Sequence, residues 1–512
     1  MSENPSTDLL VVNPLPWRRT QLGPISRHVV SPRGIVDDPT AARHFQDRDR
    51  SRSTPAAFDN GDDSAVFGSN AYWLPPTELP GFGYVVVSAD ELRILEGERI
   101  DRSEVIETGG YRVTFDLERG GVSSWYDVER ETEWIDGSCE EGFAGIVHER
   151  VADEGHERPR QLLYRYDADV NRRLVATGAT GTYDGFRADW GASRERSNEV
   201  LSHRVSALPG GFEIRQRLRV PTLRSPVSLR LFLEDSGDSM VVDAAWEMGL
   251  DTHPESTYLT FPFALDSPTP YVDVGGHAMR PGRDQLSGTC HDYYTAQRWV
   301  AFGGEERSVT VGCPLNPMVQ FGGYHFAETR STTDLERALL LGWVTSNYWD
   351  TNFRARQPGL VRAQYHFQLH ADSFDEARAH RLGMEAEHHE PLVQTTGEST
   401  AKPLEERSRG LTQSFLDLPE PPVLVHHVRP DDADPIGFPD AGDARGSGWI
   451  VLVLSNVSDE PREASIGSGL LTVEAVEAAV DEGSLQLSNG TVSLAIDGRS
   501  SYRLRLRCAP AE

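Results

Sequence analysis

Short runs of alternating apolar and polar residues recur along this chain, and most of them end at Gly, Pro, Asp or Asn. Within residues 111–117, Tyr111, Val113 and Phe115 alternate with polar neighbours, and residues 212–220 repeat the pattern. Successive side chains of a strand point to opposite faces of its sheet, so this pattern predicts half-buried strands with one wet face. Such a chain is expected to fold into antiparallel sheets.

Two further segments support an all-β fold. Residues 229–248 form two apolar runs around Asp235, Ser236, Gly237 and Asp238, which predicts a hairpin because these residue types tolerate tight turns. Helical periodicity is convincing only over residues 373–387. An α/β architecture is therefore not expected.

The chain has 512 residues, enough for roughly three domains. Polar, Pro-containing stretches suggest a long loop over residues 31–63 and breaks near 89–108 and 390–409. We expect a small N-terminal β-sandwich at 8–95, a large antiparallel β-sandwich at 105–390, a linker at 391–410 and a small C-terminal β-sandwich at 411–510.

Composition limits the partners. The net charge of -29 argues against nucleic-acid binding, because a phosphate backbone would be repelled. No apolar run approaches the roughly 18 residues that a membrane span needs, and residues 1–10 do not resemble a secretory signal. A cytoplasmic protein without membrane contact is expected.

The cysteines are scattered, with no CxxC pair, so they suggest neither a zinc knuckle nor a dense disulfide framework. We expect them to be reduced and mostly buried. They are Cys139, Cys290, Cys313 and Cys508.

The sequence offers no clear catalytic or metal motif. It contains no GxSxG, P-loop or HExxH pattern. His366 and His370 would share a strand face about 13 Å apart, too far to hold one ion directly. The His-x-Asp at His370 and Asp372 has no obvious further ligand. We expect ordinary histidines and no metal site.

One segment has the chemistry of a sugar site. Residues 342–353 combine aromatic, amide and carboxylate side chains. Aromatic faces pack on the C–H surfaces of sugars, while amides and carboxylates bond vicinal hydroxyls. The alternative is that these aromatics are core and these amides satisfy turns. The candidate substrate-binding residues are Asn347, Tyr348, Trp349, Asp350 and Asn352.

A second segment, residues 284–299, has a similar mixture. Asp284 and Gln297 are its candidate substrate-binding residues. The alternative for this segment is an ordinary strand edge.

These segments, taken in order, resemble the C-terminal β region of the α-mannosidases of glycoside hydrolase family 38. Residues 346–353 (SNYWDTNF) resemble a fairly specific motif of that region, although Ser346 replaces the first of two adjacent asparagines, and Asn316 stands where the family often has an aspartate. The other matching segments are residues 10–19 (LVVNPLPWRR), 79–84 (LPGFGY), 111–127, 284–300, 312–323 and 448–456.

The resemblance implies a large sandwich of the galactose-mutarotase type that lends loops to an active site. In the family, an N-terminal catalytic barrel carries the zinc ligands and the aspartate nucleophile, and this chain matches no part of that barrel. The resemblance therefore implies that the chain has no catalytic residue, binds no zinc by itself and is inactive without a barrel-bearing partner.

Three hypotheses follow. The first is a β-domain portion or subunit of a family 38 type α-mannosidase, which helps hydrolyse α-mannosides by completing the sugar site of a zinc-bearing barrel. The second is a non-catalytic carbohydrate-binding protein derived from that family. The third, an independent hydrolase with its own carboxylate pair, has the least support, because such pairs cannot be chosen from sequence.

Overall fold

The computed structural model divides into two compact units. The larger unit holds the described residues of Glu96–Phe374, and the smaller holds those of Met1–Ala42, Asn70–Leu95 and Asp375–Glu512. The structure describes residues 8–25, 72–88, 93–94, 98–100, 104–150, 192–251, 253–286, 288–326, 330, 332–333, 335–347, 358–389, 392–395, 412–431, 448–478 and 485–510.

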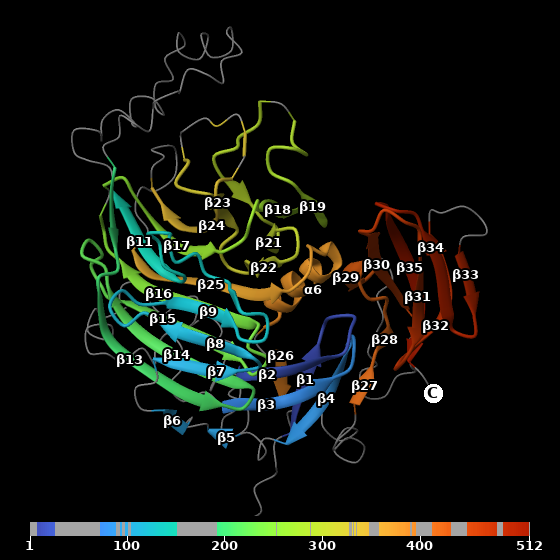
Figure 1. The fold of residues 1–512 in the computed structure, drawn as a ribbon. Coiled ribbons are helices and arrows are strands. Elements are labelled where there is room, and N and C mark those ends of the chain that lie inside the picture. Colours follow the sequence, from blue (N-terminus) through green and yellow to red (C-terminus); the bar gives the residue numbers. More distant parts are fainter. Residues whose placement is uncertain are drawn as a thin grey trace, which may run out of the picture. The chain divides into compact units, whose positions relative to one another are not determined.

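A ten-stranded antiparallel sheet forms one layer of the larger unit (Figure 1). Its strand order is β19-β18-β21-β22-β25-β16-β15-β14-β13-β6. The strands are β6 (Glu98–Ile100), β13 (Glu199–Leu208), β14 (Gly211–Arg219), β15 (Val227–Glu234), β16 (Ser239–Met248), β18 (Thr269–Val274), β19 (His277–Met279), β21 (Trp299–Gly303), β22 (Ser308–Gly312) and β25 (Gly359–His370).

A six-stranded sheet and a four-stranded sheet complete the larger unit. Their strand orders are β12-β11-β17-β24-β23-β20 and β10-β9-β8-β7. The strands are β7 (Val105–Thr108), β8 (Tyr111–Phe115), β9 (Val122–Asp127), β10 (Thr132–Glu133), β11 (Gly145–Arg150), β12 (Ser193–Arg196), β17 (Glu255–Phe263), β20 (Tyr294–Thr295), β23 (Met318–Phe321) and β24 (Ala338–Ser346).

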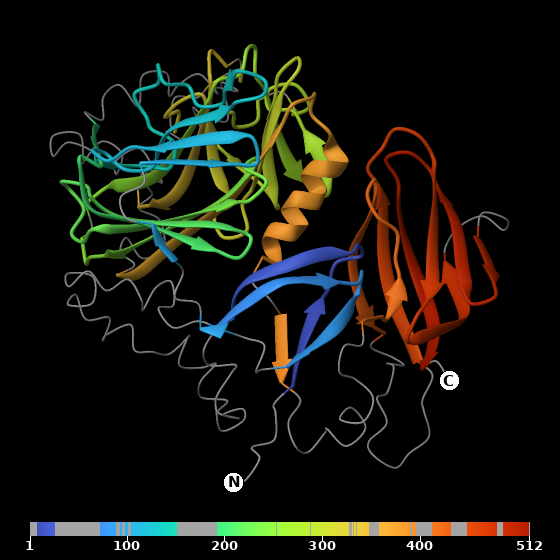
Figure 2. The same ribbon diagram turned by 60° about the horizontal axis from the view of Figure 1, so that its bottom comes forward.

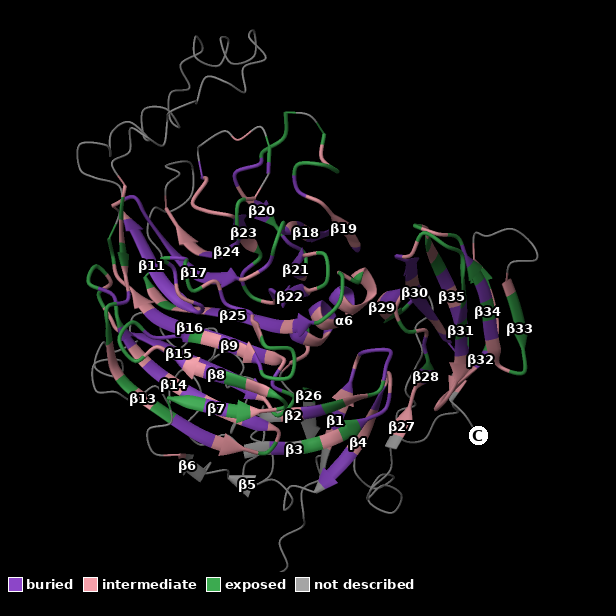
Figure 3. Cartoon of the chain, viewed as in Figure 1, coloured by how far each residue is buried: buried purple, intermediate pink, exposed green. Residues whose placement is uncertain are grey.

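Alternation along the strands builds one core between these sheets. In β15, Leu229, Leu231 and Leu233 are fully buried in the main core cluster, which also takes Phe261 and Leu340 from the six-stranded sheet. Figure 3 shows buried residues along strands of both large sheets. Burying each such side chain contributes about 1.5–3 kcal/mol, so the period-2 pattern fixes which face of each strand turns inward.

The predicted hairpin is confirmed, since β15 pairs with β16 from Leu233 opposite Met240 to Ser228 opposite Ala245. The predicted helix is also present as α6 (Glu376–Glu387), whose N-cap Asp375 accepts a hydrogen bond from the backbone of Arg378 at 2.9 Å.

The smaller unit contains four sheets. Figure 2 shows the two sheets of its C-terminal β-sandwich, β28-β31-β34-β33 and β29-β30-β35-β32, and the other two are β26-β1-β4-β27 and β2-β3-β5. The strands are β1 (Asp8–Asn13), β2 (Arg19–Ile25), β3 (Tyr72–Leu79), β4 (Gly83–Ser88), β5 (Arg93–Ile94), β26 (Leu392–Thr395), β27 (Thr412–Ser414), β28 (Leu416–Asp417), β29 (Val423–Pro430), β30 (Gly448–Asn456), β31 (Arg462–Ser468), β32 (Leu471–Ala478), β33 (Leu485–Ser488), β34 (Thr491–Ile496) and β35 (Ser501–Pro510).

The expected all-β class, a large antiparallel sandwich with smaller β-sheet regions, is therefore confirmed. Two details differ from expectation. The segment expected to be a linker begins with β26, which pairs with β1, and the break near residues 89–108 contains the short strands β5, β6 and β7. The predicted loop at 31–63 lies outside the described residues.

The four cysteines are free thiols; Cys139, Cys313 and Cys508 are buried and Cys290 is exposed, as expected. Burial raises the pKa of Cys313 and of Cys508 to about 12. No helix among the described residues is long and apolar enough to cross a membrane.

Thiol labelling tests this arrangement. Because the thiolate is the reactive form, a maleimide at pH 8 should modify Cys290 in the native protein, and Cys313 and Cys508 only after unfolding. Peptide mass spectrometry locates the label, and Cys290→Ser should remove the fast phase. Rapid native labelling of Cys313 would contradict the packing.

Candidate functional site

Asn347, directly after β24, uses its side-chain amide on the protein backbone. Its Oδ1 accepts from the backbone N–H of Glu255 at 2.6 Å, and its Nδ2 donates to the carbonyl of His253 at 2.8 Å. Its own backbone N–H donates to the carbonyl of Glu255 at 3.1 Å. Asn347 therefore fixes the end of β24 against the start of β17.

The neighbouring candidates Tyr348, Trp349, Asp350 and Asn352 lie outside the described residues. Their contact with a sugar stays a prediction. What the structure does establish is the place where that segment starts, because Asn347 is anchored by the three hydrogen bonds above.

Asp284 belongs to a turn after β19. Its carboxylate accepts from Arg280 Nε at 2.9 Å, from Arg280 Nη2 at 2.9 Å and from the Arg280 backbone at 2.8 Å. The side-chain hydrogen bonds from Arg280 lower the pKa of Asp284, so this carboxyl is ionised at neutral pH. Gln297 is exposed, and its backbone N–H donates to the carbonyl of Asp273 at 2.9 Å.

The two candidate segments meet through their aromatic side chains. Tyr293, from residues 284–299, packs edge-on against Trp343, from residues 342–353, with ring centroids 5.5 Å apart. Three further rings complete what we call the aromatic cluster. Its members are Tyr258, Tyr293, Tyr324, Phe326 and Trp343.

Trp343 is the centre of the aromatic cluster. Its ring is stacked on Tyr258 at 6.0 Å and lies 5.1 Å from Phe326. Its Nε1 donates to Ser256 Oγ at 2.9 Å, so the indole is both packed and satisfied. The cluster lies on the face of the six-stranded sheet opposite the main core, because Leu341 and Trp343 alternate with the core residue Leu340.

Next to the aromatic cluster lies an ionic network. Arg194 stands opposite Glu149 in the β11–β12 pairing and contacts its carboxylate at 2.5 Å. The Arg194 guanidinium also lies 4.1 Å from the ring centroid of Tyr324. Arg196 pairs with Glu141 at 3.0 Å. The sequence alone does not point to these residues, because β11 and β12 are separated in the chain and no local motif joins them.

Tyr324 links the network to the aromatic cluster, since its hydroxyl donates to Glu141 Oε1 at 3.2 Å. Burial disfavours the ionised form of Glu141, but hydrogen bonds from Arg196 and Cys139 outweigh it and lower the pKa of Glu141. Burial and the Glu141 charge raise the pKa of Tyr324 well above its usual value. Glu141 is thus an ionised acceptor and Tyr324 a protonated donor.

This arrangement suits polar recognition better than acid catalysis, because a carboxyl with a lowered pKa is a poor proton donor at neutral pH. Among the described residues, no group of three or more His, Cys, Asp or Glu could hold a metal ion. His370 contacts Thr310 Oγ1 through Nε2 at 3.3 Å.

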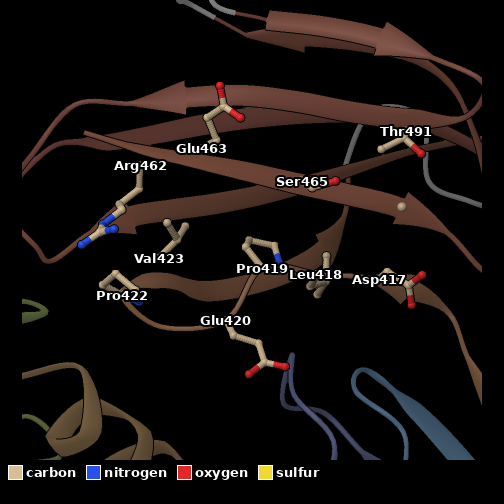
Figure 4. A pocket seen from close by; sticks show the side chains of 11 residues that line it. Asp417, Leu418, Pro419, Glu420, Pro422, Val423, Arg462, Glu463, Ser465 and Thr491 are labelled. Carbon is tan, nitrogen blue, oxygen red and sulfur yellow. The ribbon is translucent and has the colours of Figure 1, made fainter. Parts of the chain in front are cut away.

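A separate hollow of about 520 Å³ lies in the C-terminal sandwich of the smaller unit. Figure 4 shows the carboxylates of Glu420 and Glu463 pointing away from each other. They do not form a converging acid pair of the kind that cleaves glycosides. None of the predicted site residues lines this hollow.

Replacing Asn347 tests its structural role. Asn347→Ala should lower the free energy of unfolding by about 1–3 kcal/mol, because two partly buried backbone groups lose a hydrogen-bond partner. Urea unfolding of the isolated chain measures this. Gln297→Ala, at an exposed candidate residue, is the control and should stay within about 0.5 kcal/mol of the wild type. Equal effects would contradict the anchoring role.

The ionic network predicts a pH dependence. The pKa of Glu141 is lower in the folded chain than its ordinary value of about 4.3, so its stabilisation is present above that value and is lost as the pH falls below it. Glu141→Gln should therefore be less stable than the wild type at pH 7, with the difference shrinking towards pH 3.

Urea midpoints at several pH values check this prediction. Glu140→Gln is the matched control, because Glu140 also pairs with Arg196 at 3.0 Å but its side chain is 72% exposed, and exposed pairs contribute little. A Glu141→Gln difference that does not change with pH would refute the prediction.

Comparison with known proteins finds similarity in structure but none in sequence. No model of a protein family matches the sequence, and no curated protein matches it. A protein of glycosyl hydrolase family 38 from Enterococcus faecalis matches 98% of this chain with a TM-score of 0.54 and 8% identity. An α-mannosidase from Enterococcus faecalis V583 matches 99% with a TM-score of 0.55 and 8% identity.

This chain spans only 58% and 56% of the lengths of those two proteins. A galactose mutarotase-like protein from Lactobacillus casei ATCC 334 matches 53% of this chain over 100% of its own length, with a TM-score of 0.28 and 9% identity. At these identities, the two longer matches establish a fold shared with part of each E. faecalis protein.

Proposed function

We propose that this chain is the β region of an α-mannosidase of glycoside hydrolase family 38, and that it takes part in the hydrolysis of α-mannosides by completing the sugar site of a zinc-bearing barrel. The observation that carries this proposal is the match in fold over nearly the whole chain with two proteins described as members of that family or as an α-mannosidase. The motif at residues 346–353 adds support from the sequence.

In this proposal the sugar-contacting residues follow β24. Asn347 acts as a positioning residue, because its amide is bonded to the backbone of His253 and Glu255. Tyr348, Trp349, Asp350 and Asn352 then supply the aromatic, carboxylate and amide groups that suit a sugar. Asp284 and Gln297 are proposed to contribute from the second segment.

Zinc belongs to the barrel in this proposal, because the resemblance to family 38 places the zinc ligands there. Zinc bound there would orient the substrate and stabilise developing charge. The contribution of this chain is recognition: the aromatic cluster is packed and satisfied, and Asn347 anchors the end of β24. Precise positioning alone contributes substantially to catalysis.

The non-catalytic alternative, a free-standing carbohydrate-binding protein, keeps the same sugar chemistry without a barrel. The aromatic cluster, with the ionised Glu141 and the protonated Tyr324 beside it, is compatible with such a binding protein. The two functions differ in whether a second polypeptide confers activity.

Hydrolysis of an aryl α-mannoside with added zinc separates them. This chain alone should be inactive, and co-expression with the polypeptide encoded immediately upstream, if that carries a family 38 barrel, should give activity that a chelator abolishes and zinc restores. Trp349→Ala should raise KM about tenfold, a loss of about 1.4 kcal/mol.

Other outcomes have defined meanings. If neither sample is active and calorimetry shows that this chain binds mannose oligosaccharides, the chain is a carbohydrate-binding protein and not part of an enzyme. Chelator-resistant activity of this chain alone, lost in Asp350→Asn, would favour an independent hydrolase.

A further inference from the structure

A second polar hollow, of about 280 Å³, lies in the larger unit. It is formed where β18 begins and β21 ends, and all of its lining residues belong to the larger unit. It shares no residue with the aromatic cluster, the ionic network or the predicted sugar-contact residues.

Two parallel rings line this hollow. Tyr271 and Phe374 are stacked with centroids 3.9 Å apart and an interplanar angle of 14°. The fully buried Trp299 packs near Phe374 at 5.8 Å and supports the pair. Aromatic side chains in the lining of a hollow are suited to pack against the C–H groups of a sugar ring.

A glycine lies directly against the two rings. Gly303 pairs with Thr269 across β18 and β21. A Cβ at Gly303 would lie 3.1 Å from Phe374 Cβ and 3.1 Å from Tyr271 Cε2, closer than ordinary packing allows. A side chain here would require Tyr271 and Phe374 to shift by a few tenths of an ångström, so this glycine lets the strand approach the stacked pair closely.

The polar groups of the lining indicate which kind of ligand suits the hollow. Ser267 and Thr269 present hydroxyls, and Glu305 is an exposed carboxylate. The lining contains no Lys, Arg or His, so an anionic ligand would meet the Glu305 charge without compensation. Ser267 has a positive φ of 47°, a conformation that costs energy for a non-glycine residue and often occurs at ligand sites.

We propose that this hollow is a second saccharide-binding site that takes one neutral sugar residue. Aromatic faces, hydroxyls and a single carboxylate are the groups that recognise a polyol ring. The volume of about 280 Å³ lies just below the range of about 300 to 1,000 Å³ that is typical of ligand pockets, so one ring fits better than an oligosaccharide. The choice of a mannoside as the first probe rests on the proposed function.

Saturation-transfer NMR with the full chain and methyl α-mannoside tests the site, with methyl α-glucoside and inorganic phosphate as comparison probes. Glu305→Gln should weaken the binding of a neutral glycoside roughly fivefold, because a hydrogen bond to a charged group is about twice as strong as a neutral one. Glu306→Gln is the matched control, since Glu306 is an exposed neighbour outside the lining.

Binding of a neutral glycoside that weakens in Glu305→Gln and is retained in Glu306→Gln supports the site. No glycoside signal, equal effects of the two variants, or preferential binding of phosphate would overturn it. The measurement uses this chain alone and needs no barrel. Activity gained with a barrel polypeptide, together with no effect of Glu305→Gln on glycoside binding, would therefore reject this site and leave the proposed function standing.

Discussion

The larger unit depends on β24 being packed on both faces. On the inner face, Leu340 lies in the main core. Gly342 lies against Tyr365 of the ten-stranded sheet, and a Cβ at residue 342 would be only 2.2 Å from the Tyr365 hydroxyl oxygen. On the outer face, Trp343 joins the aromatic cluster. Because side chains alternate strictly along a strand, the contact at Gly342 also fixes where Trp343 is presented.

The outer face combines packing with charge compensation. Burying an unpaired charge is costly. Here Arg194 pairs with Glu149, and Arg196 pairs with Glu141. Tyr324 contacts both ion pairs, because its hydroxyl donates to Glu141 and its ring lies against the Arg194 guanidinium. The result is a packed and charge-compensated face that contains Trp343 and Tyr293, one from each of the two segments whose composition suggests sugar recognition. Supporting contacts of this kind hold a recognition site in place.

Local pattern was sufficient to predict the all-β class, the β15–β16 hairpin and helix α6, because each is specified by neighbouring residues. It did not predict β26 as a partner of β1, since that pairing joins segments far apart in the chain and the strand is only four residues long. The same limit applies to the site. Trp343 and Tyr293 lie in segments noted for their composition, whereas the pairing of Arg194 with Glu149 exists only after β12 has aligned with β11.

We propose that this chain completes a sugar site whose metal lies on another folded region. The most direct test is the structure of this chain in complex with a barrel-bearing polypeptide, zinc and a slowly cleaved α-mannoside. We expect the sugar to lie between the metal and residues 347–352, with Trp349 or Asp350 in contact with it. Failure to form a complex, or a bound sugar that no residue of this chain touches, would contradict the proposed function.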